Sequence, residues 1–242
     1  MGNLFHVVFY QPLYNALVWF YNIVPGQDLG ISIIIVTIVI RGLLWPISKS
    51  AIQAQKSMQD LQPKLEAVKK QYKDDKQVQT QKIMELYKEE KINPLGSCLP
   101  LLIQLPIFIA LYWVLRDVID SNKMEVLYSF VQNPGTVNPT AFGFLDLGAR
   151  NIYIALAAGA AQYWQASQLI TKQPEVDSEG SKDESMAASM NKQMRYTMPL
   201  ITVVIGATLP AALAFYWFLT TLVYAIQQHF LFKKKPKESI TQ

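Results

Sequence analysis

The chain has 242 residues, of which 51% are hydrophobic and 17% charged, with a formal net charge of +4. This is too apolar for an ordinary soluble domain, and long charge-free runs alternate with short segments crowded with Lys and Glu. Such alternation indicates an all-α polytopic membrane protein. The basic residues lie beside the apolar runs, where topology and anionic lipid account for them, so we expect no nucleic-acid binding. The single cysteine, Cys98, excludes an intrachain disulfide.

Residues 1–28 are aromatic and amphipathic, and Pro25-Gly26 ends the segment. Tyr and Trp favour the headgroup region, so we expect an interfacial helix lying on the membrane. A short extra span is the alternative, which Pro12 and the scattered polar residues disfavour.

Residues 29–48 form the first predicted transmembrane helix, because about 20 apolar residues cross roughly 30 Å of hydrocarbon. Arg41 lies inside this span, and Thr37 lies four residues earlier on the same helical face. An Arg within a span costs at least ~2.5–3.5 kcal/mol, which favours a position facing protein or water. Two polar groups on one face therefore predict a wet surface inside the membrane. The alternative is that the long Arg41 side chain reaches the interface and has no further role.

Residues 49–93 carry ten Lys and seven Asp or Glu. Narrow apolar stripes on two consecutive helical segments, with a turn at residues 73–76, predict an antiparallel helical hairpin. The outer side of such a charged hairpin is a solvated face.

Four more spans are predicted in the rest of the chain. The first contains Gln104 near its middle, and the last contains a polar–aromatic stripe of Tyr216, Thr220, Tyr224 and Gln227 at spacings of 4, 4 and 3. The expected segments are transmembrane helix 2 at 94–115, an extracytoplasmic loop at 116–149, helix 3 at 150–170, a cytoplasmic loop at 171–195, helix 4 at 196–211, helix 5 at 212–232 and a basic tail at 233–242.

The distribution of lysine sets the expected orientation. Ten Lys follow the first span and four more lie in the tail, whereas the first 28 residues contain none. By the positive-inside rule, the N-terminus lies outside and the hairpin, the 171–195 loop and the C-terminus lie in the cytoplasm.

The sequence shows no metal-ligand cluster, phosphate-binding loop, nucleophile elbow or paired carboxylates, so we expect neither an enzyme nor a cofactor. The chemistry instead points to a groove. Arg41 with Thr37, Gln104, Tyr216 and Thr220 would line a cationic, hydrophilic surface between the spans. Such a surface attracts an acidic or polar peptide and lowers the several-kcal/mol cost of moving polar groups through lipid.

These segments resemble the YidC-type membrane protein insertases, in the same order and over nearly the whole chain. The stretch from Asn93 to Phe108 (NPLGSCLPLLIQLPIF) is the most specific part of the resemblance. The other matching stretches are IVTIVIRGLLWP (35–46), LQPK (61–64), MELYK (84–88), LP (209–210), FYW (215–217) and QQ (227–228).

The resemblance implies a groove that is open to the cytoplasm and to lipid and closed on the outer side. Position by position, it implies that Arg41 is the groove arginine with Thr37 beside it, that Gln104 lines the groove, and that Tyr216 and Trp217 contact the incoming helix. The sequence departs from the family by lacking both a large periplasmic domain and a lipoprotein signal, and its tail is short. This favours either a bacterial member with the five-span core only, in the cytoplasmic (inner) membrane, or a trimmed form of a longer protein.

The sequence hypothesis is thus a non-enzymatic insertase and chaperone for small membrane proteins. Its expected partners are nascent membrane proteins and membrane lipid, with the ribosome and the Sec translocon left open. The alternative from another class is a channel or transporter that binds an anionic solute at Arg41. A scaffold subunit is a third hypothesis, which leaves the polar stripe unexplained.

Overall fold

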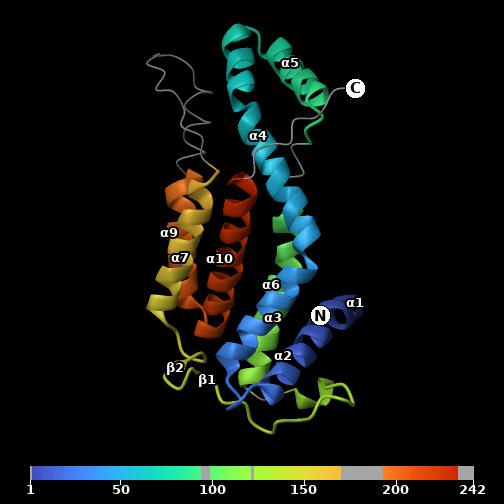
Figure 1. Ribbon diagram of the computed structural model, residues 1–242, viewed down its shortest axis with the longest axis vertical. Coiled ribbons are helices and arrows are strands. Elements are labelled where there is room, and N and C mark those ends of the chain that lie inside the picture. Colours follow the sequence, from blue (N-terminus) through green and yellow to red (C-terminus); the bar gives the residue numbers. More distant parts are fainter. Residues whose placement is uncertain (1, 94–98, 121–122, 170–192, 234–242) are drawn as a thin grey trace.

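A computed structural model describes residues 2–93, 99–120, 123–169 and 193–233 of the chain. The described part is built mostly of helices that run along one long axis, with a helical hairpin projecting from one end and the β1–β2 hairpin at the other (Figure 1). The elements are α1 (Asn3–Phe5), η1 (His6–Tyr10), α2 (Gln11–Ile23), α3 (Leu29–Leu43), α4 (Trp45–Gln71), α5 (Lys76–Glu89), α6 (Leu99–Ile119), η3 (Met124–Val126), β1 (Thr140–Ala141), β2 (Leu145–Asp146), α7 (Ile152–Ser167), η4 (Gln193–Thr197), α9 (Met198–Thr208) and α10 (Ala211–Lys233).

The N-terminal helical run α1–η1–α2 is fastened to the far end of α6. The Tyr10 hydroxyl donates a 2.6 Å hydrogen bond to the Asp117 carboxylate, and Lys123 lies 2.9 Å from the same oxygen. Burial and the neighbouring carboxylate raise the pKa of Tyr10, and burial raises the pKa of Tyr14 to about 12. The buried Asp117 carboxylate therefore has a hydrogen-bond donor in Tyr10 and an ion-pair partner in Lys123. We call Tyr10, Tyr14, Asp117 and Lys123 the N-terminal anchor.

α3 ends and α4 begins within one residue, and the two helix axes differ in direction by 67°. The cause is Pro46 in the first turn of α4, which lacks an N–H and disfavours helical backbone in the residue before it. α4 first lies against α10, where Lys56 Nζ donates to the carbonyl of Phe232 at 3.1 Å, and then runs on past the end of the bundle.

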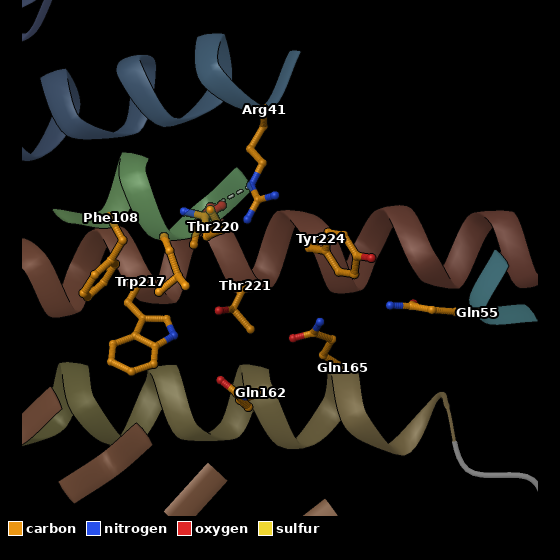
Figure 2. A pocket seen from close by; sticks show the side chains of 11 residues that line it. Arg41, Gln55, Phe108, Gln162, Gln165, Trp217, Thr220, Thr221 and Tyr224 are labelled. Atoms are coloured by element: carbon orange, nitrogen blue, oxygen red, sulfur yellow. Dashed lines mark hydrogen bonds between the residues drawn. The ribbon is translucent and has the colours of Figure 1, made fainter. Parts of the chain in front are cut away.

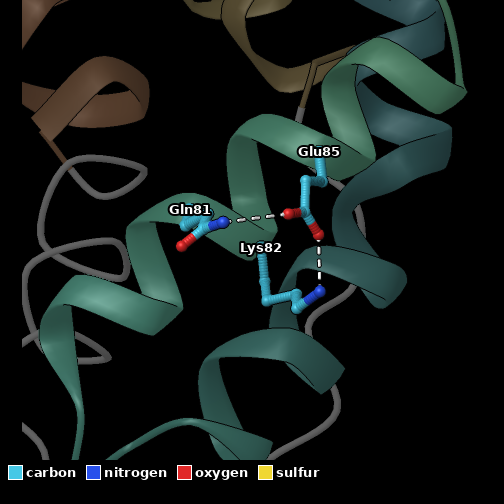
Figure 3. Close-up of polar contacts among 3 residues, drawn as sticks. All are labelled: Gln81, Lys82 and Glu85. Carbon is cyan, nitrogen blue, oxygen red and sulfur yellow. Dashed lines mark hydrogen bonds and ion pairs between the residues drawn. The ribbon is translucent and has the colours of Figure 1, made fainter.

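The predicted hairpin is formed by α4 and α5. Asp75 caps α5 by accepting hydrogen bonds from the backbone N–H groups of Gln77 and Val78. Charged side chains of the hairpin pair with near neighbours on the same helix. The Glu85 carboxylate accepts hydrogen bonds from Gln81 and, at 2.6 Å, from Lys82 (Figure 3). Leu61 and Leu65 are its buried apolar contacts in α4, so few large apolar side chains hold the hairpin together.

α10 is the central helix and contacts α3, α4, α6, α7 and α9. Its first N–H groups, which have no partner inside the helix, donate to loop carbonyls: Ala211 to Ala149 at 2.8 Å and Ala212 to Leu147 at 2.9 Å. This loop also forms the short antiparallel pair β1–β2, which the sequence did not predict. The β1–β2 turn closes on the start of α3, because Phe142 N–H donates to the Asp28 carboxylate.

α7 packs closely against α9 and α10. A Cβ at Gly159 would lie 2.3 Å from a Val203 methyl carbon, and one at Gly206 would lie 3.2 Å from the Ala155 side chain. Small residues therefore set the distance between α7 and α9.

The prediction of a helical protein is confirmed, whereas the count of five spans stays a prediction. By length and composition, one helix of the described chain could cross a membrane, at Leu102–Ile119, and the bent α3–α4 pair is a second if it counts as one span. α7 and α9 contain only 16 and 11 residues. Most of the predicted 171–195 loop and 233–242 tail, as well as Cys98, lie outside the described residues.

Candidate functional site

A pocket of about 370 Å³ lies among five helices and extends along α10, with α3 to one side of that helix and α7 to the other in Figure 2. It extends from an aromatic end, formed by Phe108 and Trp217, to a polar end near Tyr224 and Gln55. The lining residues are Arg41 from α3, Gln55 from α4, Gln104, Leu105 and Phe108 from α6, Gln162 and Gln165 from α7, and Trp217, Thr220, Thr221 and Tyr224 from α10.

Arg41 is the only charged side chain among these described lining residues. Its Nε donates a 2.6 Å hydrogen bond to the Thr220 hydroxyl, and its guanidinium carbon lies 5.7 Å from the centre of the Tyr224 ring. Neither partner carries a negative charge at neutral pH. A charge in a low-dielectric site is costly when it lacks a counter-ion, so this pocket favours an incoming anion or strong acceptor.

Gln104 and Tyr216 act as a pair. The Gln104 amide donates to the Tyr216 hydroxyl at 2.9 Å, and Tyr216 is almost fully buried. Gln104 therefore lines the pocket, whereas Tyr216 lies behind it and fixes the orientation of the amide. The sequence placed both residues at the groove, and the structure brings them together in these two roles.

Thr37, like Tyr216, was predicted to line the groove but does not belong to the pocket wall. Its side chain is buried, and its hydroxyl donates to the carbonyl of Ile33 on its own helix at 2.7 Å. Thr and Ser side chains inside helices commonly make this bond, because the carbonyl four residues earlier is the nearest acceptor.

Trp217 forms the aromatic end of the pocket together with Phe108. The two rings meet edge to face, with centroids 5.4 Å apart and planes at 74°. Both side chains are only partly buried. They offer an apolar surface directly beside the polar lining, which suits a segment that carries apolar and polar groups in succession.

Sequence reasoning missed the contribution of three glutamines and of Thr221. Gln162 and Gln165 are the signal that could have identified α7 as a pocket wall, since they are three residues apart in an Ala-rich helix. Gln162 also accepts a 3.1 Å hydrogen bond from Thr202 of α9. Gln55 belongs to α4, which charge patterning assigned to the cytoplasm, yet the first turns of α4 lie beside α10.

The site as a whole offers one cation, several amides and hydroxyls and an aromatic end. Among the residues that the structure describes, no group of three or more His, Cys, Asp or Glu side chains could hold a metal ion. The lining is suited to holding a carboxylate, a peptide group or a polar side chain by hydrogen bonds, next to an apolar surface.

The fold resembles that of a solved protein, described as an active YidC insertase with its first transmembrane domain resolved. The TM-score is 0.59 at 24% sequence identity, over 93% of this chain and 47% of that one. This likeness concerns the fold.

Sequence comparison gives the family. The chain is 32% identical over 232 residues to a protein of Tolumonas auensis and 34% identical over 231 residues to one of Shewanella amazonensis, each named membrane protein insertase YidC. The matches cover 95% of this chain but only 37% and 38% of those relatives, so the chain spans little more than a third of their length. Residues 19–238 match the model of the family described as 60Kd inner membrane protein. The resemblance noted in the sequence is thereby confirmed, and the chain belongs to the 60Kd inner membrane protein family.

Proposed function

We propose that this protein is a membrane protein insertase and chaperone, which moves the polar end of a small membrane protein across the bilayer through the Arg41 pocket. The observation that carries the proposal is that Arg41 meets only neutral partners, Thr220 and Tyr224, in a pocket whose other described lining residues are all uncharged. The names of the relatives support the same function.

The proposed path begins in the cytoplasm and ends in lipid. With the N-terminus outside and the C-terminus in the cytoplasm, the α4–α5 hairpin and the Gln55 end of the pocket face the cytoplasm. At the opposite end of the bundle lie the buried residues at the start of α10, such as Ala212 and Leu213, and the β1–β2 turn, and we propose that they close the pocket on that side. A polypeptide could therefore enter the pocket from one side only.

The bilayer around the site is expected to be thin. At about 1.5 Å per residue, α7 and the continuous η4–α9 helix, with 16 residues each, span roughly 24 Å, less than the ~30 Å hydrocarbon core. A hydrophobic span shorter than the hydrocarbon core is accommodated by local thinning of the bilayer. The distance that a polar tail must cross is thereby reduced, while the pocket supplies hydrogen bonds for part of that distance.

The energetic sequence has three steps. Arg41 and the amides bind the polar tail of the client and offset its desolvation. The apolar part of the client lies against the aromatic end and the lipid beside it. Partition of that apolar segment into the bilayer then drives the tail through and releases it, since roughly 20 apolar residues favour the membrane strongly. No chemical reaction or cofactor is required.

The experiment uses purified protein in liposomes and a single-span client with an acidic translocated tail, whose protection from added protease is measured. Wild type and Arg41→Lys should insert the client, whereas Arg41→Ala should lose most of the activity. The alternative, a channel or transporter for an anionic solute, predicts Arg41-dependent anion uptake by the same liposomes. Uptake without client insertion would overturn the proposal in favour of that alternative.

A further inference from the structure

A second arginine, Arg195, lies at the junction of α7 and α9 and does not line the pocket. Its guanidinium carbon is 5.7 Å from the centre of the Tyr163 ring and 5.4 Å from that of Tyr196. One Nη donates a long, 3.4 Å hydrogen bond to the Tyr163 hydroxyl. We call these three residues the Arg195 cluster.

Within the described chain, the Arg195 cluster contains a cation without a carboxylate. Its Nε is buried and has no hydrogen-bond partner, and no described Asp or Glu forms an ion pair with it. Arg116 provides the contrast. It also lies over an aromatic ring, that of Trp113, but it has the Asp120 carboxylate at 3.9 Å. Two aromatic faces orient the Arg195 fork, and its second Nη group has no hydrogen bond to any described residue, which leaves it for an external acceptor.

The surroundings of the cluster identify the kind of acceptor. Tyr196 and Tyr163 are 53% and 39% exposed, and the apolar side chains of Leu200 and Val204 are exposed further along α9. Aromatic side chains above an exposed apolar strip are typical of the membrane–water interface. The end of α7 and the start of α9 lie at the same end of the bundle as the base of the α4–α5 hairpin (Figure 1). In the proposed topology this is the cytoplasmic leaflet, where anionic lipids concentrate.

We infer that the Arg195 cluster is a binding site for the phosphate group of an anionic phospholipid. A planar guanidinium binds phosphate through two parallel hydrogen bonds, and the two tyrosines hold the fork at the depth of the headgroup. The lipid would occupy the outer surface of the α7–α9 pair, which packs through small residues and forms one wall of the pocket through Gln162 and Gln165. This inference goes beyond the proposed function, because it concerns lipid and does not require a client.

The test measures which lipids stay bound to the purified protein in detergent, by native mass spectrometry with added phosphatidylglycerol or phosphatidylcholine. Arg195→Gln should lower phosphatidylglycerol retention about fivefold, the effect of one basic residue near an anionic surface. Arg195→Lys should keep most of it, and Arg116→Gln, the matched control, should leave it unchanged. Phosphatidylcholine should be retained less than phosphatidylglycerol by wild type and equally by all variants.

Three results would overturn the inference. The first is equal phosphatidylglycerol retention by wild type and Arg195→Gln. The second is loss of retention in step with a lowered melting temperature in both Arg195 variants, which would make the residue structural. The third is displacement of phosphatidylglycerol by millimolar inorganic phosphate, which would assign the site to a soluble anion. Because no client is present, these results are independent of the insertion assay.

Discussion

Positive charges have different partners in the pocket and in the α4–α5 hairpin. In the hairpin, the exposed Lys82 lies 2.6 Å from Glu85, whose pKa the ammonium and its hydrogen bond hold below the usual range. In the pocket, Arg41 has a hydroxyl and an aromatic ring as partners. Water and neighbouring carboxylates already satisfy the charges of the hairpin, so they offer little to a ligand. Arg41 keeps its capacity for an anion, because none of the described residues that line the pocket carries a negative charge.

A carboxylate placed inside the pocket is the strongest way to break this contrast. Thr221→Asp would add a carboxylate to the pocket lining that Arg41 belongs to, where it would attract the guanidinium and compete with the client's carboxylates. Insertion of acidic-tailed clients should fall as far as in Arg41→Ala. The measurement is protease protection of the client tail in liposomes.

The matched control for that change is Thr221→Asn, which has nearly the same shape and no charge, and should insert normally. Thr80→Asp on the exposed face of α5 should also leave insertion unchanged. If Thr221→Asp and Thr221→Asn are equally impaired at equal abundance, the charge of Arg41 is not what the client uses.

The N-terminal anchor offers a second contrast to Arg41, because its buried acid, Asp117, has both a hydrogen-bond donor, Tyr10, and an ion-pair partner, Lys123. Tyr10→Phe should lower the free energy of unfolding by about 1.5–3 kcal/mol, the range for a hydrogen bond to a charged group. SDS-induced unfolding in detergent measures this. Tyr153→Phe, a change at an exposed tyrosine whose hydroxyl has no hydrogen bond to any described residue, is the control and should have little effect. A stable Tyr10→Phe variant would mean that the anchor does not hold α2 to α6.

The same anchor predicts a dependence on alkaline pH. Tyr14 ionises near pH 10 in an unfolded chain, whereas its folded pKa is about 12 and that of Tyr10 is also raised. The unfolded state therefore loses these protons first, so the tyrosines' contribution to stability is constant below about pH 10 and falls as the pH rises from there towards 12. In SDS unfolding at a series of pH values, Tyr14→Phe should show a shallower loss than wild type. Identical slopes would contradict the assigned burial.

The smallest expected effect is in the hairpin itself. Lys82→Gln removes an ion pair between two exposed side chains, and screening by water and salt leaves such pairs with little net stability. Insertion and unfolding should both match wild type within error. A strong loss of insertion with normal stability would show that the hairpin charges contact the client or a partner. The difference between the hairpin charges and Arg41 would then not hold.

Helical periodicity accounts for what the sequence predicted. The spacing of Tyr216, Thr220 and Tyr224 placed them on one face of α10, and the structure places all three around Arg41 and Gln104. Arg41 could be singled out because a charge inside an apolar run is expensive and needs a polar environment. Within a helix, a residue's face follows from its number, so these residues were accessible to sequence reasoning.

Contacts between separate segments were not accessible in this way. Thr37 shares a face with Arg41, but its rotamer, which turns the hydroxyl to Ile33, is set by the backbone around it. Gln55 joins the pocket because of the 67° bend between α3 and α4. Asp117 is buried because α6 continues to Ile119, past the predicted end at 115, and meets Tyr10 from a segment 107 residues away.

The most direct test of the central claim is a double-mutant cycle between Arg41 and the acidic residues of a client tail, scored as insertion into liposomes. Arg41→Ala should impair the acidic client strongly and a client with neutral amides in place of its carboxylates much less. The coupling should be about 1–4 kcal/mol, the range for a close charge pair in a partly hydrated site. Protein abundance is measured alongside. If Arg41→Ala impairs both clients equally, the coupling is zero, and Arg41 does not act by holding the client's charge.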